Sequence, residues 1–366
     1  MTQNTPGPFR ADHVGSLLRP ERLLQARKDY KAGEITSQEL YEVETVELKR
    51  IVDKQIEVGL DVVTDGEFRR DWWHLDFLEH LNGIEGYVPS KGFDFEEEET
   101  EPYNIRNIGK ISFNKEHPFI KDFIEFDKIV AGRAVAKQTI PSPNQLLYVG
   151  MRNPDIYPNI EDYATDIVKV YKEALAAFYD AGCRYLQLDD VSIAGFVTNN
   201  DFIYDDAYTM DQLFDLSLRM VNSVLDNKPD DLTVTTHLCR GNYRSTYAFS
   251  GAYDKIAPRL FPEEKVDGFF LEYDDERSGT FEPLKYVPSG GPKVVIGIFT
   301  SKTGELEDKE AIKARIAEAR KYVSDDQICL SPQCGFSSTH HGNKLTEEQQ
   351  WAKLKFIADV AKEVWG

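Results

Sequence analysis

His237 and Cys239 are separated by one leucine in a short β-branched run, residues 233–239. Side chains two positions apart lie on the same face of a β-strand, so the imidazole and the thiol point the same way. Glu272 ends a second predicted strand, and Cys334 ends a third. An imidazole, a carboxylate and two thiolates can complete a tetrahedral Zn²⁺ shell. The sequence therefore predicts a zinc site at His237, Cys239, Glu272 and Cys334.

The other two cysteines are not part of this set. Cys329 lies five positions before Cys334 and hence on the opposite face of an unbroken strand. The chain has only four cysteines and no CxxC pair, which removes the zinc-ribbon and thioredoxin motifs and argues against a disulfide framework. We expect Cys183 and Cys329 to be buried thiols.

Two carboxylates also follow predicted strands, at Glu67 and Asp189. Together they could hold the ammonium group of a substrate, which is the usual way to neutralise a buried cation. Because Arg69 and Arg70 follow Glu67, a salt bridge at the rim of the sheet is the alternative interpretation.

The N-terminal region offers backbone donors for a substrate carboxylate. The N–H groups of Gly15 and Ser16 could bind such a group. His13 precedes them and could be either structural or catalytic. The tryptophan pair at residues 72–73 predicts core packing and loop cover, and the histidine pair at residues 340–341 predicts an exposed loop.

These groups need elements that bring distant parts of the chain together. Short β-branched runs alternate with longer segments of helical spacing, which is the pattern of a parallel sheet wrapped by helices. The eight candidate strands are residues 12–16, 61–66, 134–140, 185–190, 233–239, 268–273, 294–299 and 328–334, and the clearest helices are residues 37–58, 160–181, 210–225, 308–323 and 347–364. We predict an α/β fold, a (β/α)8 TIM barrel with insertions and an active site at the C-terminal ends of the strands.

We expect one domain over residues 1–366, with an inserted excursion at about 83–132. The chain is longer than a typical barrel of about 250 residues, and this stretch is turn-rich. A doubly wound nucleotide-binding fold is disfavoured because no GxGxxG follows an early strand.

The charge balance restricts the partners. The chain has 43 basic and 63 acidic residues, a net charge of −20, which argues against nucleic acid or an anionic membrane as a partner. No apolar stretch approaches the roughly 18 residues that span a bilayer, and no apolar run near the N-terminus could serve as a signal-peptide core. We expect a cytoplasmic protein with small-molecule partners, and leave open whether it forms a homo-oligomer.

In these motifs the chain resembles the catalytic, C-terminal barrel of cobalamin-independent methionine synthase, over nearly its whole length. The matching segments are HVGS at 13–16, DGE at 65–67, LQLDD at 186–190, THLC at 236–239, the strand of Glu272, GP at 291–292 and PQCG at 332–335. The resemblance implies that His237, Cys239, Glu272 and Cys334 bind Zn²⁺. It also implies that Glu67 and Asp189 hold the amino group of homocysteine, and that Gly15 and Ser16 meet its carboxylate.

The chain departs from this family in three respects. The full-length synthases have a second, N-terminal barrel that helps to bind the folate, and this chain resembles the shorter bacterial branch. The family's proton-donor histidine is absent from residues 297–300, so that role is vacant or is taken by another group such as His13. The tryptophan that stacks on the pterin has no counterpart at residues 141–148, where Tyr148 is a partial replacement.

The resemblance implies methyl transfer from a donor such as methyltetrahydrofolate to homocysteine, forming methionine. A free thiol has a pKa of roughly 8.5, and zinc would remove its proton to leave a soft thiolate. Alkyl transfer to another thiol, as in epoxide:coenzyme M transferases, is the alternative within the superfamily. A zinc hydrolase is the alternative from another class, although two thiolate ligands would make zinc a poor Lewis acid for water. A non-catalytic metabolite-binding barrel is disfavoured because the whole ligand set is present.

Overall fold

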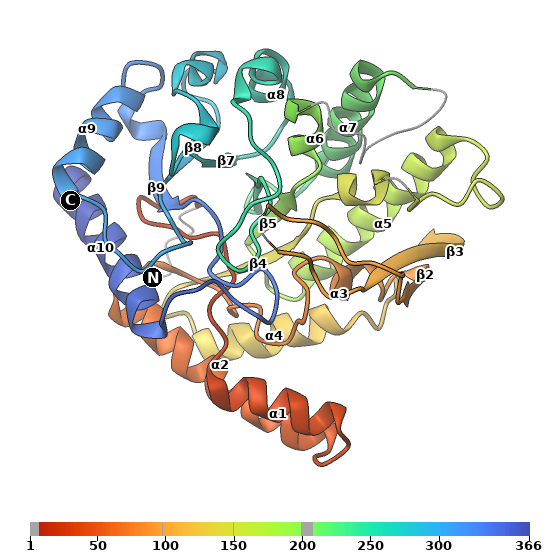
Figure 1. The fold of residues 1–366 in the computed structure, drawn as a ribbon. Coiled ribbons are helices and arrows are strands. Elements are labelled where there is room, and N and C mark those ends of the chain that lie inside the picture. The colour runs from red at the N-terminus through yellow and green to blue at the C-terminus, as the bar shows by residue number, and fades with distance from the viewer. Residues whose placement is uncertain (1–6, 97, 149, 199–207) are drawn as a thin grey trace.

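A seven-stranded, curled sheet forms the centre of the protein in the computed structural model (Figure 1). The structure describes residues 7–96, 98–148, 150–198 and 208–366. The strand order is β1-β4-β5-β6-β7-β8-β9, and all neighbours are parallel. These strands are β1 (Val62–Val63), β4 (Val135–Pro141), β5 (Tyr185–Asp190), β6 (Thr233–Leu238), β7 (Gly268–Glu272), β8 (Lys293–Phe299) and β9 (Ile328–Pro332). A strand therefore lies at seven of the eight predicted positions.

The first predicted strand, residues 12–16, is not a regular strand, so this prediction was wrong. Ala11 makes only an isolated bridge to Leu330 of β9, and at the other end the Leu17 N–H donates to the Gly66 carbonyl at 3.0 Å, just after β1. Between them Gly15 has a φ of 146°. The Gly15 carbonyl accepts from the Thr64 hydroxyl at 2.6 Å. Side-chain bonding and this glycine conformation thus replace a regular ladder in the segment between β9 and β1.

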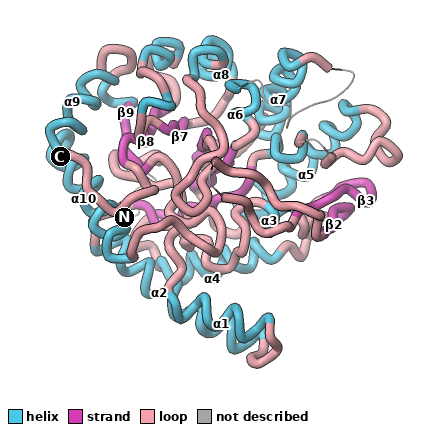
Figure 2. Tube along the Cα trace, in the orientation of Figure 1, coloured by secondary structure: helices cyan, strands magenta, loops and turns pink. Residues whose placement is uncertain are grey.

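The helices lie around the sheet (Figure 2). Strands β5, β6, β7 and β9 are buried at every position, as expected for a parallel sheet covered on both faces. The α-helices are α1 (Glu21–Lys31), α2 (Ser37–Glu57), α3 (Leu75–Leu78), α4 (Pro118–Val130), α5 (Ile160–Asp180), α6 (Ile193–Thr198), α7 (Met210–Leu225), α8 (Ala257–Glu263), α9 (Lys309–Ala319) and α10 (Glu347–Trp365). Short 3-10 helices are η1 (Pro143–Leu147), η2 (Tyr253–Lys255), η3 (Glu276–Ser278), η4 (Glu282–Tyr286) and η5 (Asp325–Gln327).

Sequence signals explain where the long helices begin. Helices α2, α7 and α10 each start with a capping box, in which a threonine accepts from the backbone three residues on and a Glu or Gln reaches back. Buried residues recur at helical spacing along α5 and α7, and these two helices pack against each other. The predicted helices at these positions are present, with ends shifted by a few residues.

The predicted excursion at residues 83–132 contains regular structure. Strands β2 (Asn82–Tyr87) and β3 (Asn104–Ser112) form an antiparallel hairpin beside the main sheet (Figure 1). Helix α4 then packs against α2, α5 and β4. The segment that joins β2 to β3, residues 88–103, is the part of the excursion that reaches the functional site described below; its residue 97 lies outside the described residues.

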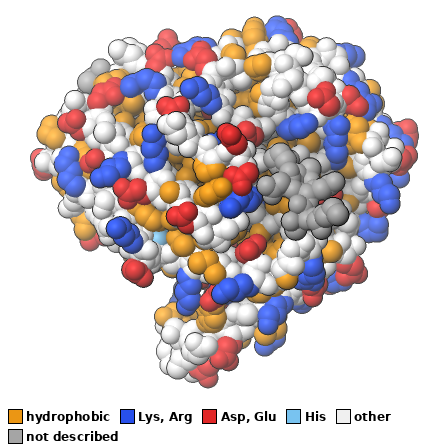
Figure 3. Space-filling view, turned by 180° about the vertical axis from the view of Figure 1, so that it is seen from behind, with side chains coloured by type: hydrophobic (Ala, Val, Ile, Leu, Met, Phe, Trp, Pro, Cys, Tyr) orange, Lys and Arg blue, Asp and Glu red, His pale blue; other side chains and the backbone are white. Residues whose placement is uncertain are grey.

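Acidic and basic side chains are interspersed over the face shown in Figure 3. Among the described residues, no helix is long and apolar enough to cross a membrane. Residues 1–6, part of the stretch in which no signal-peptide core is expected, lie outside the described residues.

Candidate metal centre and cavity

The structure brings together the side chains that the sequence predicts as metal ligands. His237 lies in β6 and Glu272 ends β7, while Cys239 and Cys334 follow β6 and β9. Their four ligand atoms lie within 4.8 Å of one another, and all four residues are buried. The two sulfur atoms are 3.6 Å apart, and both cysteines are free thiols. These four residues lie close together because parallel strands place their carboxyl ends at the same edge of the sheet.

The bonding of these residues leaves ligand atoms available. Both ring nitrogens of His237 are buried and have no hydrogen-bond partner among the described residues. Burial, with a further contribution from Lys137, lowers the pKa of His237 to about 3, so the imidazole is neutral. Glu272 Oε1 accepts from the Arg240 N–H at 2.7 Å, and Oε2 lies 3.7 Å from Arg277 Nη2. Buried polar atoms without partners are unfavourable, and a cation would satisfy them.

The surroundings of Cys239 determine how readily its thiol ionises. The Cys334 thiol, then burial, raises the pKa of the Cys239 thiol well above its ordinary value. The Gly241 N–H donates to Cys239 Sγ at 3.2 Å. The Cys239 thiol therefore resists ionisation, and a bound cation would reverse this preference because metal ligation favours the thiolate.

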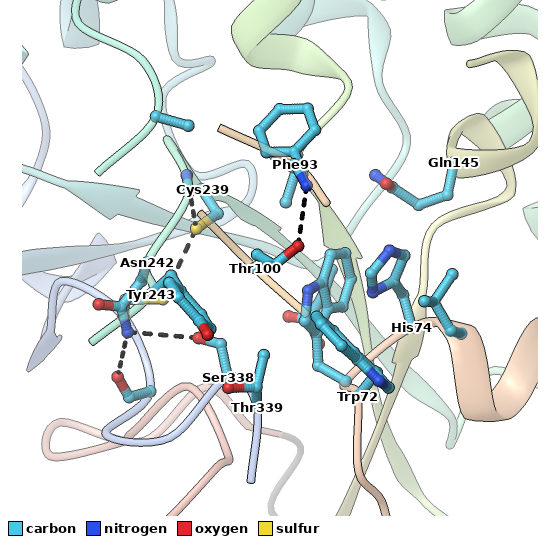
Figure 4. A pocket seen from close by; sticks show the side chains of 18 of the residues that line it. Trp72, His74, Phe93, Thr100, Gln145, Cys239, Asn242, Tyr243, Ser338 and Thr339 are labelled. Atoms are coloured by element: carbon cyan, nitrogen blue, oxygen red, sulfur yellow. Dashed lines mark hydrogen bonds between the residues drawn. The ribbon is translucent and has the colours of Figure 1, made fainter. Parts of the chain in front are cut away.

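A cavity of about 270 Å³ opens beside this cluster. It is lined by His237, Cys239 and Cys334, by both predicted carboxylates, and by many aromatic side chains. Figure 4 shows Cys239 on one side of the cavity and Trp72 and His74 on the other.

Glu67 and Asp189, the two carboxylates singled out in the sequence, both line the cavity. Glu67 Oε1 accepts from the Thr139 hydroxyl at 2.9 Å, whereas its Oε2 is buried without a partner. Asp189 Oδ1 accepts from Gln187 Nε2 at 2.7 Å. Burial raises the pKa of both carboxyls, and the nearby Glu67 raises that of Asp189 further. A cation bound between these two buried carboxyls would favour their charged forms.

Both interpretations of Glu67 have support in the structure. Arg70 Nη1 lies 3.5 Å from Glu67 Oε1, so a buried ion pair exists. Arg69 instead pairs with Asp122 at 2.8 Å. The Arg70 pair engages only one carboxylate oxygen and leaves Oε2 open to a ligand.

The N-terminal segment places only alternate residues in the cavity. Val14 and Ser16 line it, whereas His13 and Gly15 do not. The His13 ring is buried beside Gln55, and burial lowers its pKa to about 4. The structure thus does not bring His13 to the reacting groups.

Two glycines allow close packing around the N-terminal segment. A Cβ at Gly15 would lie 2.7 Å from Thr139 Cγ2, and a Cβ at Gly335 would lie 2.0 Å from Ser16 Oγ and 3.2 Å from its nitrogen. Any side chain at residue 335 would collide with the Ser16 hydroxyl, so glycine lets the loop after β9 pack closely against Ser16.

The sequence interpretation missed the aromatic wall of the cavity. The tryptophan pair at residues 72–73, with His74, lines the cavity directly after the DGE motif. Trp73 and His74 stack with ring centroids 4.3 Å apart. The segment between β2 and β3 adds Phe93 and Tyr103. Two tryptophans just beyond a strand-end carboxylate were the signal that could have identified this wall.

The fold and the site define a class: a parallel α/β protein with a buried thiol, imidazole and carboxylate cluster at the carboxyl ends of its strands. The chain belongs to the family described as cobalamin-independent synthase, catalytic domain, whose model matches residues 9–363. The family expected from the motifs is confirmed. It is a methionine-synthase-like methyltransferase family whose members bind homocysteine and a methyl donor and are typically metal-dependent.

Three known proteins illustrate the similarity. The uncharacterized protein YxjH of Bacillus subtilis is 50% identical over 98% of this chain and 95% of its own length. A solved structure from Listeria monocytogenes, assigned as a vitamin-B12-independent methionine synthase, is 43% identical, covers 99% of both chains and has a TM-score of 0.81. A B12-independent methionine synthase from Shewanella, solved with selenomethionine, is 19% identical over 98% of both chains with a TM-score of 0.75, and shows likeness of fold alone.

Proposed function

We propose that this protein is a zinc-dependent methyltransferase that transfers a methyl group to the thiol of homocysteine and forms methionine. The observation that carries the proposal is the cluster of His237, Cys239, Glu272 and Cys334 beside a cavity with two buried carboxyls. In this proposal the segment 11–17 closes the sheet into a (β/α)8 barrel, residues 1–366 are one domain, and the protein is cytoplasmic.

The ligand set fits zinc. Zn²⁺ binds thiolates at about 2.3 Å, so two sulfurs of a tetrahedral shell lie about 3.8 Å apart; Cys239 Sγ and Cys334 Sγ are 3.6 Å apart. The unpartnered nitrogens of His237 supply a neutral imidazole ligand. Thiolate and imidazole ligands are the soft and borderline donors that suit zinc over magnesium or calcium.

When bound, zinc supplies the acidity that turns an alkyl thiol into a thiolate nucleophile at neutral pH. The protein's own residues hold the substrate: Glu67 and Asp189 bind its ammonium group, and the backbone at Ser16, which lines the cavity, binds its carboxylate. Held at both ends, the substrate has its sulfur fixed with respect to the donor, which converts an encounter into a positioned reaction. The aromatic side chains that line the cavity exclude water from the methyl group while it is transferred.

The methyl donor would bind in the same cavity as homocysteine. Tyr148 lines the cavity and is a candidate to stack on a flat donor such as methyltetrahydrofolate. We assign no residue to protonation of the leaving group, because His13 lies outside the cavity lining. Of the alternatives, hydrolysis is disfavoured by the two sulfur ligands, which reduce the Lewis acidity of the metal.

The decisive experiment is a methionine-formation assay on zinc-loaded protein with homocysteine and four donors: mono- and polyglutamyl methyltetrahydrofolate, S-methylmethionine and methylcobalamin. We expect methionine with at least one donor, and no turnover by Cys239→Ser. Cys183→Ala is the matched control, because Cys183 is also buried but lies outside the cluster. Absence of methionine with every donor would reject homocysteine methylation.

A further inference from the structure

Glu101, His340 and His341 form a second group of potential metal ligands, separate from the sulfur cluster. Their ligand atoms lie within 4.8 Å of one another. His341 Nε2 is 3.3 Å and His340 Nε2 is 3.9 Å from Glu101 Oε1. The two histidine side chains are only 22% and 21% exposed, so this pair is more enclosed than the exposed loop that the sequence predicted.

The separations match those of ligands around one ion. Nitrogen and oxygen ligands bind zinc at about 2.0 to 2.2 Å, so two of them in a tetrahedral shell lie about 3.4 Å apart. The two imidazole rings lie side by side, with centroids 4.0 Å apart, and direct the same ring nitrogen toward one carboxylate. Both nitrogens and this carboxylate oxygen are therefore close enough together to share one ion.

Neighbouring hydroxyls orient the second imidazole for ligation. His341 Nδ1 lies 3.5 Å from the Tyr243 hydroxyl and 3.4 Å from the Thr339 hydroxyl. With a metal ion bound at Nε2, the Nδ1 proton would have these hydroxyl oxygens as acceptors. Such outer contacts fix the tautomer of metal-binding histidines. The His340 N–H also donates to the Asp71 carbonyl at 2.9 Å, which holds the loop.

The charges around the group permit a cation. Burial lowers the pKa of both imidazoles, which favours the neutral form that binds metals. Two cationic side chains face the group, and each is paired: Lys31 Nζ lies 2.8 Å from Asp71, and Arg244 Nε lies 3.6 Å from Glu98. The net field therefore does not repel a divalent ion.

We infer that Glu101, His340 and His341 bind a divalent transition-metal ion such as Zn²⁺, with water completing its shell. The site has only nitrogen and oxygen ligands, which distinguishes it chemically from the sulfur cluster. Glu101 belongs to the segment between β2 and β3, and the histidines belong to the loop between β9 and α10. The ion would join these two segments beside Tyr243 and Thr339, which line the cavity.

The test is a metal titration of the full-length protein. Protein stripped with chelator is dialysed against buffered Zn²⁺ and its metal content is measured for wild type, His341→Ala and Glu101→Gln. We expect two equivalents in wild type and one in each variant. His80→Ala is the matched control, because His80 is exposed and lies outside both groups; it should retain two equivalents.

Cobalt substitution identifies which site remains. Thiolate ligands give Co²⁺ a sulfur-to-metal charge-transfer band, so the remaining equivalent in His341→Ala should keep this band, which also shows that the variant folds. A single equivalent in wild type that carries the charge-transfer band, or two equivalents in either variant, would overturn the inference. Loss of the charge-transfer equivalent with retention of the other would instead count against the sulfur cluster and leave this site standing.

Discussion

Arg277 is a cationic side chain beside Glu272, one of the four proposed metal ligands. Its Nη2 lies 3.7 Å from Glu272 Oε2 and 3.5 Å from Asp274 Oδ1, and its guanidinium stacks over the Tyr247 ring at 4.0 Å. In the proposed site Arg277 would contact neither the metal nor the substrate. It fixes the direction and charge of a ligand, which is how groups behind a metal shell tune affinity.

Replacing Arg277 by methionine should therefore weaken zinc binding by roughly 10- to 100-fold. Zinc affinity is measured by competition with a chromophoric chelator, independently of activity. Arg320→Met is the control, since Arg320 pairs with Asp325 at 2.6 Å far from the centre. Equal affinities of the two variants would show that Arg277 has no part in holding Glu272.

Replacing either of the two buried carboxyls, Asp189 or Glu67, should weaken substrate binding. Asp189→Asn and Glu67→Gln each remove a charged partner of the substrate ammonium, and such hydrogen bonds are worth about 1.5 to 3 kcal/mol. KM for homocysteine should rise roughly 10- to 100-fold, with a smaller change in kcat, because the ammonium does not react. Asp180→Asn, on the exposed end of α5, is the control. A fall in kcat with unchanged KM would contradict this role.

At the scale of elements, the segment between β9 and β1 depends on Gly15. Alanine there would combine the strain of a φ of 146° with a Cβ only 2.7 Å from Thr139 Cγ2 of β4. Gly15→Ala should lower the free energy of unfolding by about 2 to 4 kcal/mol. Gly33→Ala has a φ of 75° and open space around the Cβ, so it should cost only about 1 kcal/mol. Urea denaturation compares them, and equal losses would refute the packing argument.

The elements also show what the sequence could predict. The convergence of Cys239, Glu272 and Cys334 was predictable because it needs only parallel strands whose buried runs and ends can be read locally. The irregular course of residues 12–16 was not, since it depends on the Thr64 hydroxyl replacing ladder bonds. The placement of Phe93 and Tyr103 in the cavity was not predictable either, because tertiary contacts and no local periodicity fix the segment between β2 and β3.

At the scale of the whole molecule, buried neutral histidines make stability depend on pH. His117 packs between Phe77 and Phe113, and its Nε2 contacts the Phe77 carbonyl at 3.0 Å. Burial lowers its pKa to about 4. Because the unfolded chain has a histidine pKa of about 6.5, it takes up the proton first. The stabilisation is complete above pH 6.5 and is lost as the pH falls toward 4.

The variant His117→Asn, which retains a helix-capping side chain for α4, isolates this contribution. From pH 7 to pH 5 the wild type should lose about 2 kcal/mol of unfolding free energy through His117 alone. The difference in stability between wild type and variant should therefore shrink by about that amount. Denaturant titrations at both pH values measure it, and a difference that stays constant would mean that His117 is already charged in the folded protein.

The functional groups are divided unevenly along the chain. Ser16, Glu67 and Asp189 come from the part before β6, whereas His237, Cys239, Glu272 and Cys334 all come from β6 onward. During synthesis on the ribosome the proposed substrate-binding residues are thus made first, and Cys334, the last of the proposed metal ligands, is made only after β9. A nascent chain cannot complete the proposed metal centre before β9 has been made, so termination before residue 334 would release proteins that have the proposed substrate-binding residues but an incomplete set of metal ligands.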